Sequence, residues 1–109
     1  MAATTQRVRD LNDALRSTLQ GGRVLMTSGV QALGEATVAT ALARMRTFNE
    51  FTADNDPHGE HDFGSFGADG ATFFFKIDYY DSRMQGGSED PSDPAQTTRV
   101  LTLMLASEY

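Results

Sequence analysis

The stretch that decides the fold is Phe73-Phe74-Phe75-Lys76-Ile77-Asp78-Tyr79-Tyr80-Asp81, because its side chains alternate in character. In an extended strand, successive side chains point to opposite faces of a sheet. The alternation predicts a core-facing set consisting of Phe73, Phe75, Ile77 and Tyr79. The opposite set consists of Phe74, Lys76, Asp78 and Tyr80. We expect this second set either to lie under the loop at residues 54–64 or to form a contact surface.

A glycine-containing segment before this stretch predicts a hairpin. Gly67-Ala68-Asp69-Gly70 separates two predicted arms, residues 62–66 and residues 71–80. Glycine and aspartate suit the unusual backbone angles of tight hairpin turns. We therefore place a central hairpin at about residues 61–80, preceded by an irregular loop at residues 53–61 that contains Pro57 and Gly59.

Helical periodicity predicts three helices around this hairpin. In the first, Val8, Leu11, Leu15 and Leu19 share one face, and Gly21-Gly22 ends the helix. Its charged residues, including Asp13 and Arg16, are expected mostly to face water. An alanine-rich segment at residues 35–46 predicts the second helix.

The third helix is predicted from Asp93 onward. Asp93 suits an N-cap, Pro94 suits the first helical position, and Gln96 completes a capping box. Apolar side chains then cover much of the circumference, so we expect this helix to be the most buried. These side chains are Val100, Leu101, Leu103, Met104 and Leu105.

Two short segments complete the predicted fold. Residues 23–27 form an apolar run between glycines and predict a strand, and residues 47–52 favour an edge strand. The prediction is a two-layer α+β domain, with an antiparallel sheet of three to four strands and three helices. A chain of 109 residues is large enough for one core and too small for two, so we expect a single domain over residues 1–109.

Composition narrows the class of protein. The chain has no cysteine, which excludes a disulfide scaffold, a thiolate nucleophile and cysteine-based zinc sites. The first nineteen residues include five charged side chains, a pattern that fits neither a signal peptide nor a membrane span. We therefore expect a cytoplasmic protein without membrane contact.

Acidic residues concentrate in the middle of the chain. The formal net charge is −6, but residues 50–93 contain eleven acidic residues against only Lys76 and Arg83. A negative potential of this kind opposes direct binding to nucleic acid phosphates. It favours a protein partner with a basic surface, although a solvated acidic surface is the simpler interpretation.

Both histidines lie in the segment Asn55-Asp56-Pro57-His58-Gly59-Glu60-His61-Asp62-Phe63-Gly64. His58 and His61, with Asp62, Glu60 or Asp78, are ligand types that suit an open site for a divalent metal such as zinc. A calcium loop is disfavoured because its twelfth position would be Ser65. This alternative predicts a metal-dependent or acid-base hydrolase-like enzyme centred on the loop at 54–64.

Two other interpretations of the same residues remain open. A histidine beside carboxylates suits general acid-base catalysis without a metal, but the sequence shows no paired nucleophile and no phosphate-binding glycine loop. Alternatively, His61, Asp62, Lys76 and Asp78 bond to one another and pin the long loop to the sheet.

Three stretches together resemble a known family: residues 55–64, Lys76-Ile77-Asp78-Tyr79-Tyr80-Asp81 and Arg99-Val100-Leu101-Thr102-Leu103-Met104-Leu105. Over nearly its whole length the chain is similar to small uncharacterised alphaproteobacterial proteins that share a domain of unknown function. The resemblance implies a bacterial, cytoplasmic, stand-alone domain from plasmid or other mobile-element gene sets. It assigns no activity to any residue, and its context favours interference with host or phage machinery over metabolism.

The sequence favours a non-enzymatic protein-interaction module that uses an acidic, aromatic surface and needs no cofactor. Carboxylates speed encounter with a basic partner, and aromatic rings supply buried contact area. One special case is an inhibitor of a nucleic-acid-handling or defence protein, in which carboxylates imitate phosphates. The face that contains Phe74 and Tyr80 also suits the contact surface of a homodimer. The candidate partner-binding residues are Asp54, Asp56, His58, Glu60, His61, Asp62, Phe74, Lys76, Asp78 and Tyr80.

Overall fold

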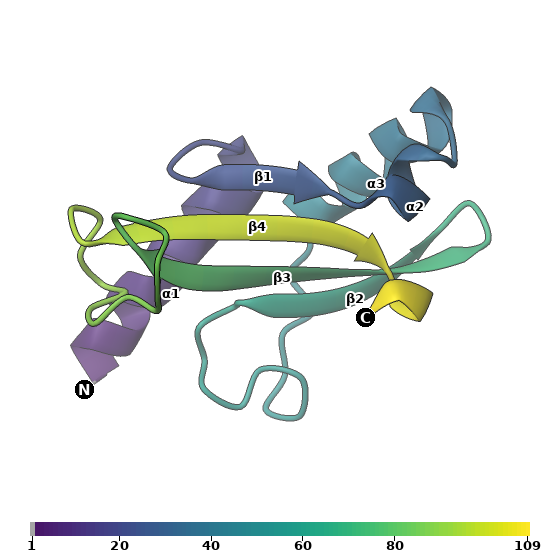
Figure 1. Ribbon diagram of the computed structural model, residues 1–109. Coiled ribbons are helices and arrows are strands. Elements are labelled where there is room, and N and C mark those ends of the chain that lie inside the picture. The colour runs from purple at the N-terminus through teal and green to yellow at the C-terminus, as the bar shows by residue number, and fades with distance from the viewer. Residues whose placement is uncertain (1) are drawn as a thin grey trace.

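The computed structural model describes residues 2–109 and confirms an α+β fold of three helices and a four-stranded sheet (Figure 1). Within residues 2–109, no helix combines the length and the apolar character needed to cross a bilayer. The elements are α1 (Ala2–Thr18), β1 (Arg23–Met26), α2 (Ser28–Gln31), α3 (Glu35–Arg46), β2 (Phe63–Ala68), β3 (Ala71–Asp81), β4 (Thr97–Leu105) and a closing 3-10 turn η1 (Ala106–Glu108).

The sheet has the strand order β1-β4-β3-β2 and is mostly antiparallel. β2 pairs with β3, and β3 with β4, in antiparallel register. β1 instead runs parallel to β4, with Arg23 opposite Val100. The sheet is therefore mixed, where the sequence predicted an antiparallel one.

The predicted central hairpin is confirmed as β2 and β3. The register runs without interruption from the pair Phe63–Lys76 to the pair Ala68–Ala71. Only Asp69 and Gly70 form the turn, with φ of 49° and 81°. Positive φ at both central residues is the signature of a type I′ hairpin turn, whose twist matches that of the flanking strands. The turn is thus two residues long, shorter than the predicted segment 67–70.

The core lies between the sheet and the helices α1 and α3, which cover one face of it (Figure 1). Phe73, Phe75 and Ile77 of β3 are buried on this face, as their alternation predicted. Leu101 and Leu103 of β4 join them, together with Leu15 of α1 and Met45 of α3. Rings and branched side chains on facing layers thus fill one continuous core.

The predicted third helix is wrong, because residues 97–105 form the central strand β4. Residues before it do form a turn, in which Asp93 Oδ2 accepts a 2.8 Å hydrogen bond from Gln96 Nε2. The chain then extends, since β1 and β3 offer backbone partners on both sides. Val100 and Met104 are buried on one face of the strand, and Leu101 and Leu103 on the other. A strand that is apolar on both faces has the same side-chain composition as a buried helix.

Two smaller predictions are also wrong. Residues 47–52 form no strand; Phe48 and Phe51 turn inward instead and pack edge-on against Phe75. Arg16, expected to face water, is buried. The α3 helix and the strand at residues 23–26 agree with prediction.

Candidate functional site

The candidate residues fall into two separate groups. Glu60 and His61 contact α1 on the helix-covered side of the sheet, and Asp56 contacts His61. Phe74, Lys76, Asp78 and Tyr80 alternate with the core residues of β3 and therefore point to the opposite face. Residues 54–62 of the loop thus do not cover the second set, whereas Phe63, the first residue of β2, packs against Phe74 on that face.

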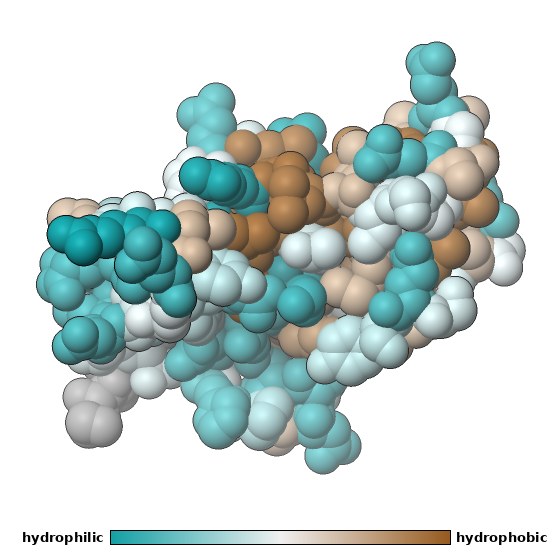
Figure 2. Space-filling view, in the orientation of Figure 1, coloured by the Kyte–Doolittle hydropathy of each residue, from teal (hydrophilic) through white to brown (hydrophobic). Residues whose placement is uncertain are grey.

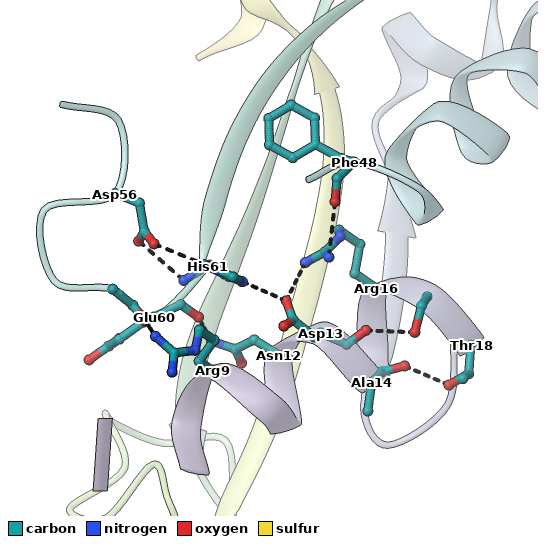
Figure 3. Close-up of polar contacts among 12 residues, drawn as sticks. Arg9, Asn12, Asp13, Ala14, Arg16, Thr18, Phe48, Asp56, Glu60 and His61 are labelled. Atoms are coloured by element: carbon teal, nitrogen blue, oxygen red, sulfur yellow. Dashed lines mark hydrogen bonds and ion pairs between the residues drawn. The ribbon is translucent and has the colours of Figure 1, made fainter. Parts of the chain in front are cut away.

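His61 joins the long loop to α1 (Figure 3). Its Nδ1 lies 2.8 Å from Asp13 Oδ1, and its Nε2 lies 3.7 Å from Asp56 Oδ2. The ring stacks on Phe51 with the ring centroids 3.8 Å apart and the planes only 5° from parallel. Its backbone has a φ of 56°, uncommon for a residue other than glycine. Asp56 holds that conformation by accepting a 3.1 Å hydrogen bond from the His61 backbone N–H.

Arg16 lies next to this histidine, inside the protein. Its Nη1 donates to the same Asp13 Oδ1 at 3.0 Å, and its Nη2 donates to the Phe48 carbonyl at 3.2 Å (Figure 3). The guanidinium also lies over the Phe51 ring, 5.2 Å from its centroid. A buried cation needs such paired and aromatic contacts to offset its desolvation.

A second buried network is centred on Asn12 of α1. The Asn12 side-chain amide donates to the Tyr79 hydroxyl at 2.7 Å and to the Glu60 carbonyl at 3.0 Å. Tyr79 in turn donates to Glu60 Oε1 at 2.8 Å. Burial raises the pKa of Tyr79, so the phenol stays protonated and remains a donor.

Arg99 of β4 completes this network. Its Nε donates to Asn12 Oδ1 at 2.8 Å, and its Nη2 donates to the Pro91 carbonyl. Its guanidinium lies over the Tyr79 ring, 5.2 Å from the centroid. Burial lowers the pKa of Arg99, with the nearby Tyr79 and Glu60 opposing that effect. The network fastens the loop before β4 to α1.

These two networks, taken together, tie loops to a helix. Each ring nitrogen of His61 faces a carboxylate, and no hydroxyl nucleophile adjoins the histidine among its recorded partners. His58 is exposed, and the structure does not bring His58, His61 and Asp62 together as ligands. Within residues 2–109, no three histidine, aspartate or glutamate side chains are grouped as a metal site requires.

Asp62, at the end of the loop, is partly buried. Burial raises the pKa of Asp62, and the negative charges of Glu60 and Asp56 add to that effect. Within residues 2–109, its carboxylate belongs to no ion pair. Burial therefore outweighs the backbone hydrogen bond and the nearby His58, which both favour the charged carboxylate.

Within residues 2–109, the opposite side of the sheet, here called the open face, has no helix over it apart from the closing turn η1 (Figure 1). Apolar and polar surfaces alternate across it, with an apolar patch over β1 and β4 (Figure 2). Leu25 of β1 is among its exposed apolar side chains. The open face comprises Arg23, Leu25, Phe63, Ser65, Gly67, Thr72, Phe74, Lys76, Asp78, Tyr80, Thr98, Val100, Thr102 and Met104.

Three aromatic rings form a cluster on the open face. Phe63 and Phe74 lie with their ring centroids 5.1 Å apart, and Tyr109 lies 5.8 Å from the first and 5.5 Å from the second. Tyr109 is nevertheless 75 % exposed. Glu108 holds the end of the chain there by accepting a 2.6 Å hydrogen bond from Thr27 and a 2.8 Å bond from the Leu105 N–H.

One ion pair lies beside this cluster. Lys76 Nζ is 2.8 Å from Asp78 Oδ2, and both side chains remain 38 % exposed. The hydrogen bond to Asp78 raises the pKa of Lys76, so the ammonium stays charged at neutral pH. The centre of the open face therefore carries two charges of opposite sign, which cancel locally.

Several residues of these sites had no role in the sequence-based hypotheses. Asn12, Asp13, Arg16 and Arg99 anchor the loops, and Tyr109 extends the aromatic cluster. One signal was present for Asn12, which is a polar residue on the apolar face of α1 between Val8 and Leu15. Such a position indicates a buried hydrogen-bonding partner.

Comparisons with known proteins give a family and no activity. Neither the curated proteins nor the solved structures include a match to this chain. Residues 26–108 match the model of a family described as "Protein of unknown function (DUF3768)". That range includes β2, β3 and β4 and leaves out α1. The resemblance to a family of unknown function is thereby confirmed, and the chain belongs to this family.

Proposed function

We propose that the protein is a non-enzymatic protein-interaction module whose contact surface is the open face. The observation that supports this is the aromatic cluster of Phe63, Phe74 and Tyr109 on a sheet face that no helix covers. Aromatic side chains with partial exposure are enriched at protein interfaces, where they supply contact area at low entropic cost. Tyr80 and the apolar Leu25 extend the same surface.

The partner has a basic surface. The open face is bordered, where β3 ends and β4 begins, by a hydrophilic segment at residues 82–96 (Figure 2). That segment contains Glu89, Asp90 and Asp93 against the single cation Arg83. A negative rim around an aromatic centre steers a positively charged protein and orients it. The loop carboxylates Asp56 and Glu60 lie on the other side and do not form part of this contact.

Nucleic-acid-handling proteins are one class with the required basic surface. We place the partner in this class, or among defence proteins, in a bacterial cytoplasm and a mobile-element setting. The negative charge of residues 50–93 opposes direct binding of the chain to nucleic acid. The protein therefore acts by occupying a partner, without a cofactor.

The test compares partner capture by the intact chain and by variants of the open face. Tyr109→Ser and Phe74→Ser together remove two rings of the cluster, whereas Leu33→Ser removes an exposed apolar side chain outside the sheet. We expect the double variant to lose its partner and the Leu33 variant to keep it. Binding should weaken steeply as salt rises. Equal capture by both variants, or an affinity insensitive to salt, contradicts the proposal.

A further inference from the structure

β2 is an unprotected edge of the sheet. It has one neighbour, β3, and its sequence Phe63-Gly64-Ser65-Phe66-Gly67-Ala68 contains no charged residue, no proline and no bulge. Natural proteins normally protect edge strands with one of these features, because a bare edge pairs with other chains. The opposite edge strand, β1, has only four residues and begins with Arg23. The contrast indicates that the β2 edge has an occupant.

The direction of the backbone groups shows which hydrogen-bond donors and acceptors this edge presents to another chain. The Ile77 N–H donates to the Asp62 carbonyl at 2.8 Å, so even-numbered residues of this strand direct their backbone groups toward β3. The N–H and C=O groups of Phe63, Ser65 and Gly67 therefore point away from the sheet. Within residues 2–109, these groups make no recorded backbone hydrogen bond. Ser65 and Gly67 are also exposed.

No contact within a single copy explains why residue 67 is a glycine. A Cβ added there would meet nothing closer than the Ala71 carbonyl oxygen at 3.8 Å. Glycine in a strand weakens the strand and often marks the close approach of another group. Gly64 differs, because a side chain there would collide with the rings of Phe75 and Phe48 of its own copy.

The sequence of β2 is complementary to itself in antiparallel register. If two copies pair about Ser65, Phe63 of one copy lies opposite Gly67 of the other, and Phe66 lies opposite Gly64. Gly64 and Gly67 of each copy thus lie opposite a phenylalanine ring of the other copy, an arrangement that stabilises glycine in sheets. Shifting the register by two residues places Phe63 opposite Asp69 of the turn in one direction and opposite Ser65 in the other, and either shift loses this match.

Space is available beside this edge. A pocket of about 250 Å³ opens next to Phe66 and Gly67 and is also lined by Arg44, Phe48 and Glu50. In the register centred on Ser65, Asp62 of the second copy lies opposite Ala68, next to this pocket. Asp62 is the partly buried carboxylate without an ion-pair partner, and Arg44 is an exposed cation. Their charges are complementary across the contact.

We propose that the occupant of the β2 edge is a second copy of this chain, paired antiparallel about a two-fold axis at Ser65. The two four-stranded sheets then form one continuous sheet, and neither β2 edge remains free. A two-fold axis perpendicular to the sheet places both open faces on the same side. The dimer therefore presents two aromatic clusters side by side, and the contact differs from a homodimer through Phe74 and Tyr80.

Charged substitutions of Ser65, which lies on the proposed two-fold axis, test both the dimer and its register. Ser65 is exposed, and its side chain is opposite itself in the proposed pairing. Sedimentation equilibrium of the intact chain should give twice the monomer mass of 11.9 kDa. Ser65→Lys and Ser65→Glu should each weaken self-association by up to about fivefold, because like charges then face each other. An equimolar mixture of the two variants should recover a dimer, since opposite charges meet.

Each result decides the proposal. Circular dichroism first establishes that both variants fold, as expected for an exposed position. A monomeric intact chain, single variants that dimerise unchanged, or a mixture that stays monomeric overturns it. Loss of the dimer through Phe74→Ser in place of Ser65→Lys overturns it as well and assigns the contact to the open face. Capture of a basic partner is measured separately, so it can fail while the dimer persists, and the reverse also holds.

Discussion

The Nε of Arg99 donates a 2.8 Å hydrogen bond to Oδ1 of Asn12, and both side chains are buried. This bond joins α1 to the central strand β4 across 87 positions of sequence. Asn12 also bonds to Tyr79 and to the Glu60 carbonyl, so one amide connects a helix, two strands and the long loop. The first helix is therefore part of the architecture, although the family match begins after it.

Replacing Asn12 should destabilise the fold strongly. Asn12→Ala removes three hydrogen bonds and leaves the buried Arg99 Nε without an acceptor. We expect a loss of about 2–4 kcal/mol in the free energy of unfolding, measured by urea denaturation. Gln6→Ala, at an exposed position of the same helix, is the control and should change it by less than about 0.5 kcal/mol. Similar values for the two variants would contradict the role of the network.

The two histidines should differ in their effect on stability. His61→Ala removes the bond to Asp13 and the stack on Phe51, and we expect a loss of about 1–3 kcal/mol. Amide hydrogen exchange should also accelerate in the loop at 52–61, because its tie to α1 is gone. His58→Ala, at an exposed position, should leave both quantities unchanged. Equal protection of the loop in the two variants would show that His61 does not hold it.

Asp62→Asn should stabilise the monomer at neutral pH, measured at dilutions where the proposed pairing with a second copy does not form. The pKa of Asp62 is raised from its usual 3.8, so the folded state binds a proton more tightly than the unfolded chain. The stability linked to that proton is present below pH 3.8 and is lost as pH rises through the raised value. Asparagine removes the cost of the buried charge, a gain that solvent screening limits to about 1 kcal/mol. Thermal melts should show the gain at neutral pH and little change near pH 3, with the exposed Asp54→Asn as control. A loss of stability at neutral pH contradicts this.

Glu108→Gln should loosen the end of the chain, with the opposite pH dependence. The bond from Thr27 and the bond from the Leu105 N–H lower the pKa of Glu108 below its usual 4.5. The associated stability is present above pH 4.5 and is lost as pH falls through the lowered value. We therefore expect Glu108→Gln to increase the mobility of the Tyr109 ring at neutral pH, measured by NMR, and to have no effect in strong acid. Glu89→Gln is the control. An unchanged Tyr109 ring at neutral pH would remove Glu108 as its anchor.

The hairpin shows what local sequence can specify. Asp69-Gly70 supplies the positive φ of the turn, and strict alternation from Phe73 to Tyr79 assigns the buried face. Both signals lie within a few residues of the structure they create. The α3 helix, with its own local periodicity, was predictable for the same reason.

The last strand shows where local sequence is ambiguous. Asp93, Pro94 and Gln96 do form the turn that a helix start requires, and the apolar residues after it fit a helix as well as a doubly buried strand. Pairing with β1 and β3 resolves this ambiguity, and neither partner strand lies within the local stretch of sequence that forms β4. The burial of Arg16 and Arg99 is likewise decided by contacts from other elements.

The sequence by itself determined the α+β class, the central hairpin and the acidic middle of the chain, because turn geometry, side-chain alternation and charge are properties of neighbouring residues. Only the tertiary structure decided that Thr97–Leu105 is a strand, that His61 faces Asp13, and that the loop carboxylates lie away from Phe74 and Tyr80. The physical reason is that a backbone or side-chain group takes its partner from whichever element packs against it. That choice depends on contacts between residues far apart in the chain.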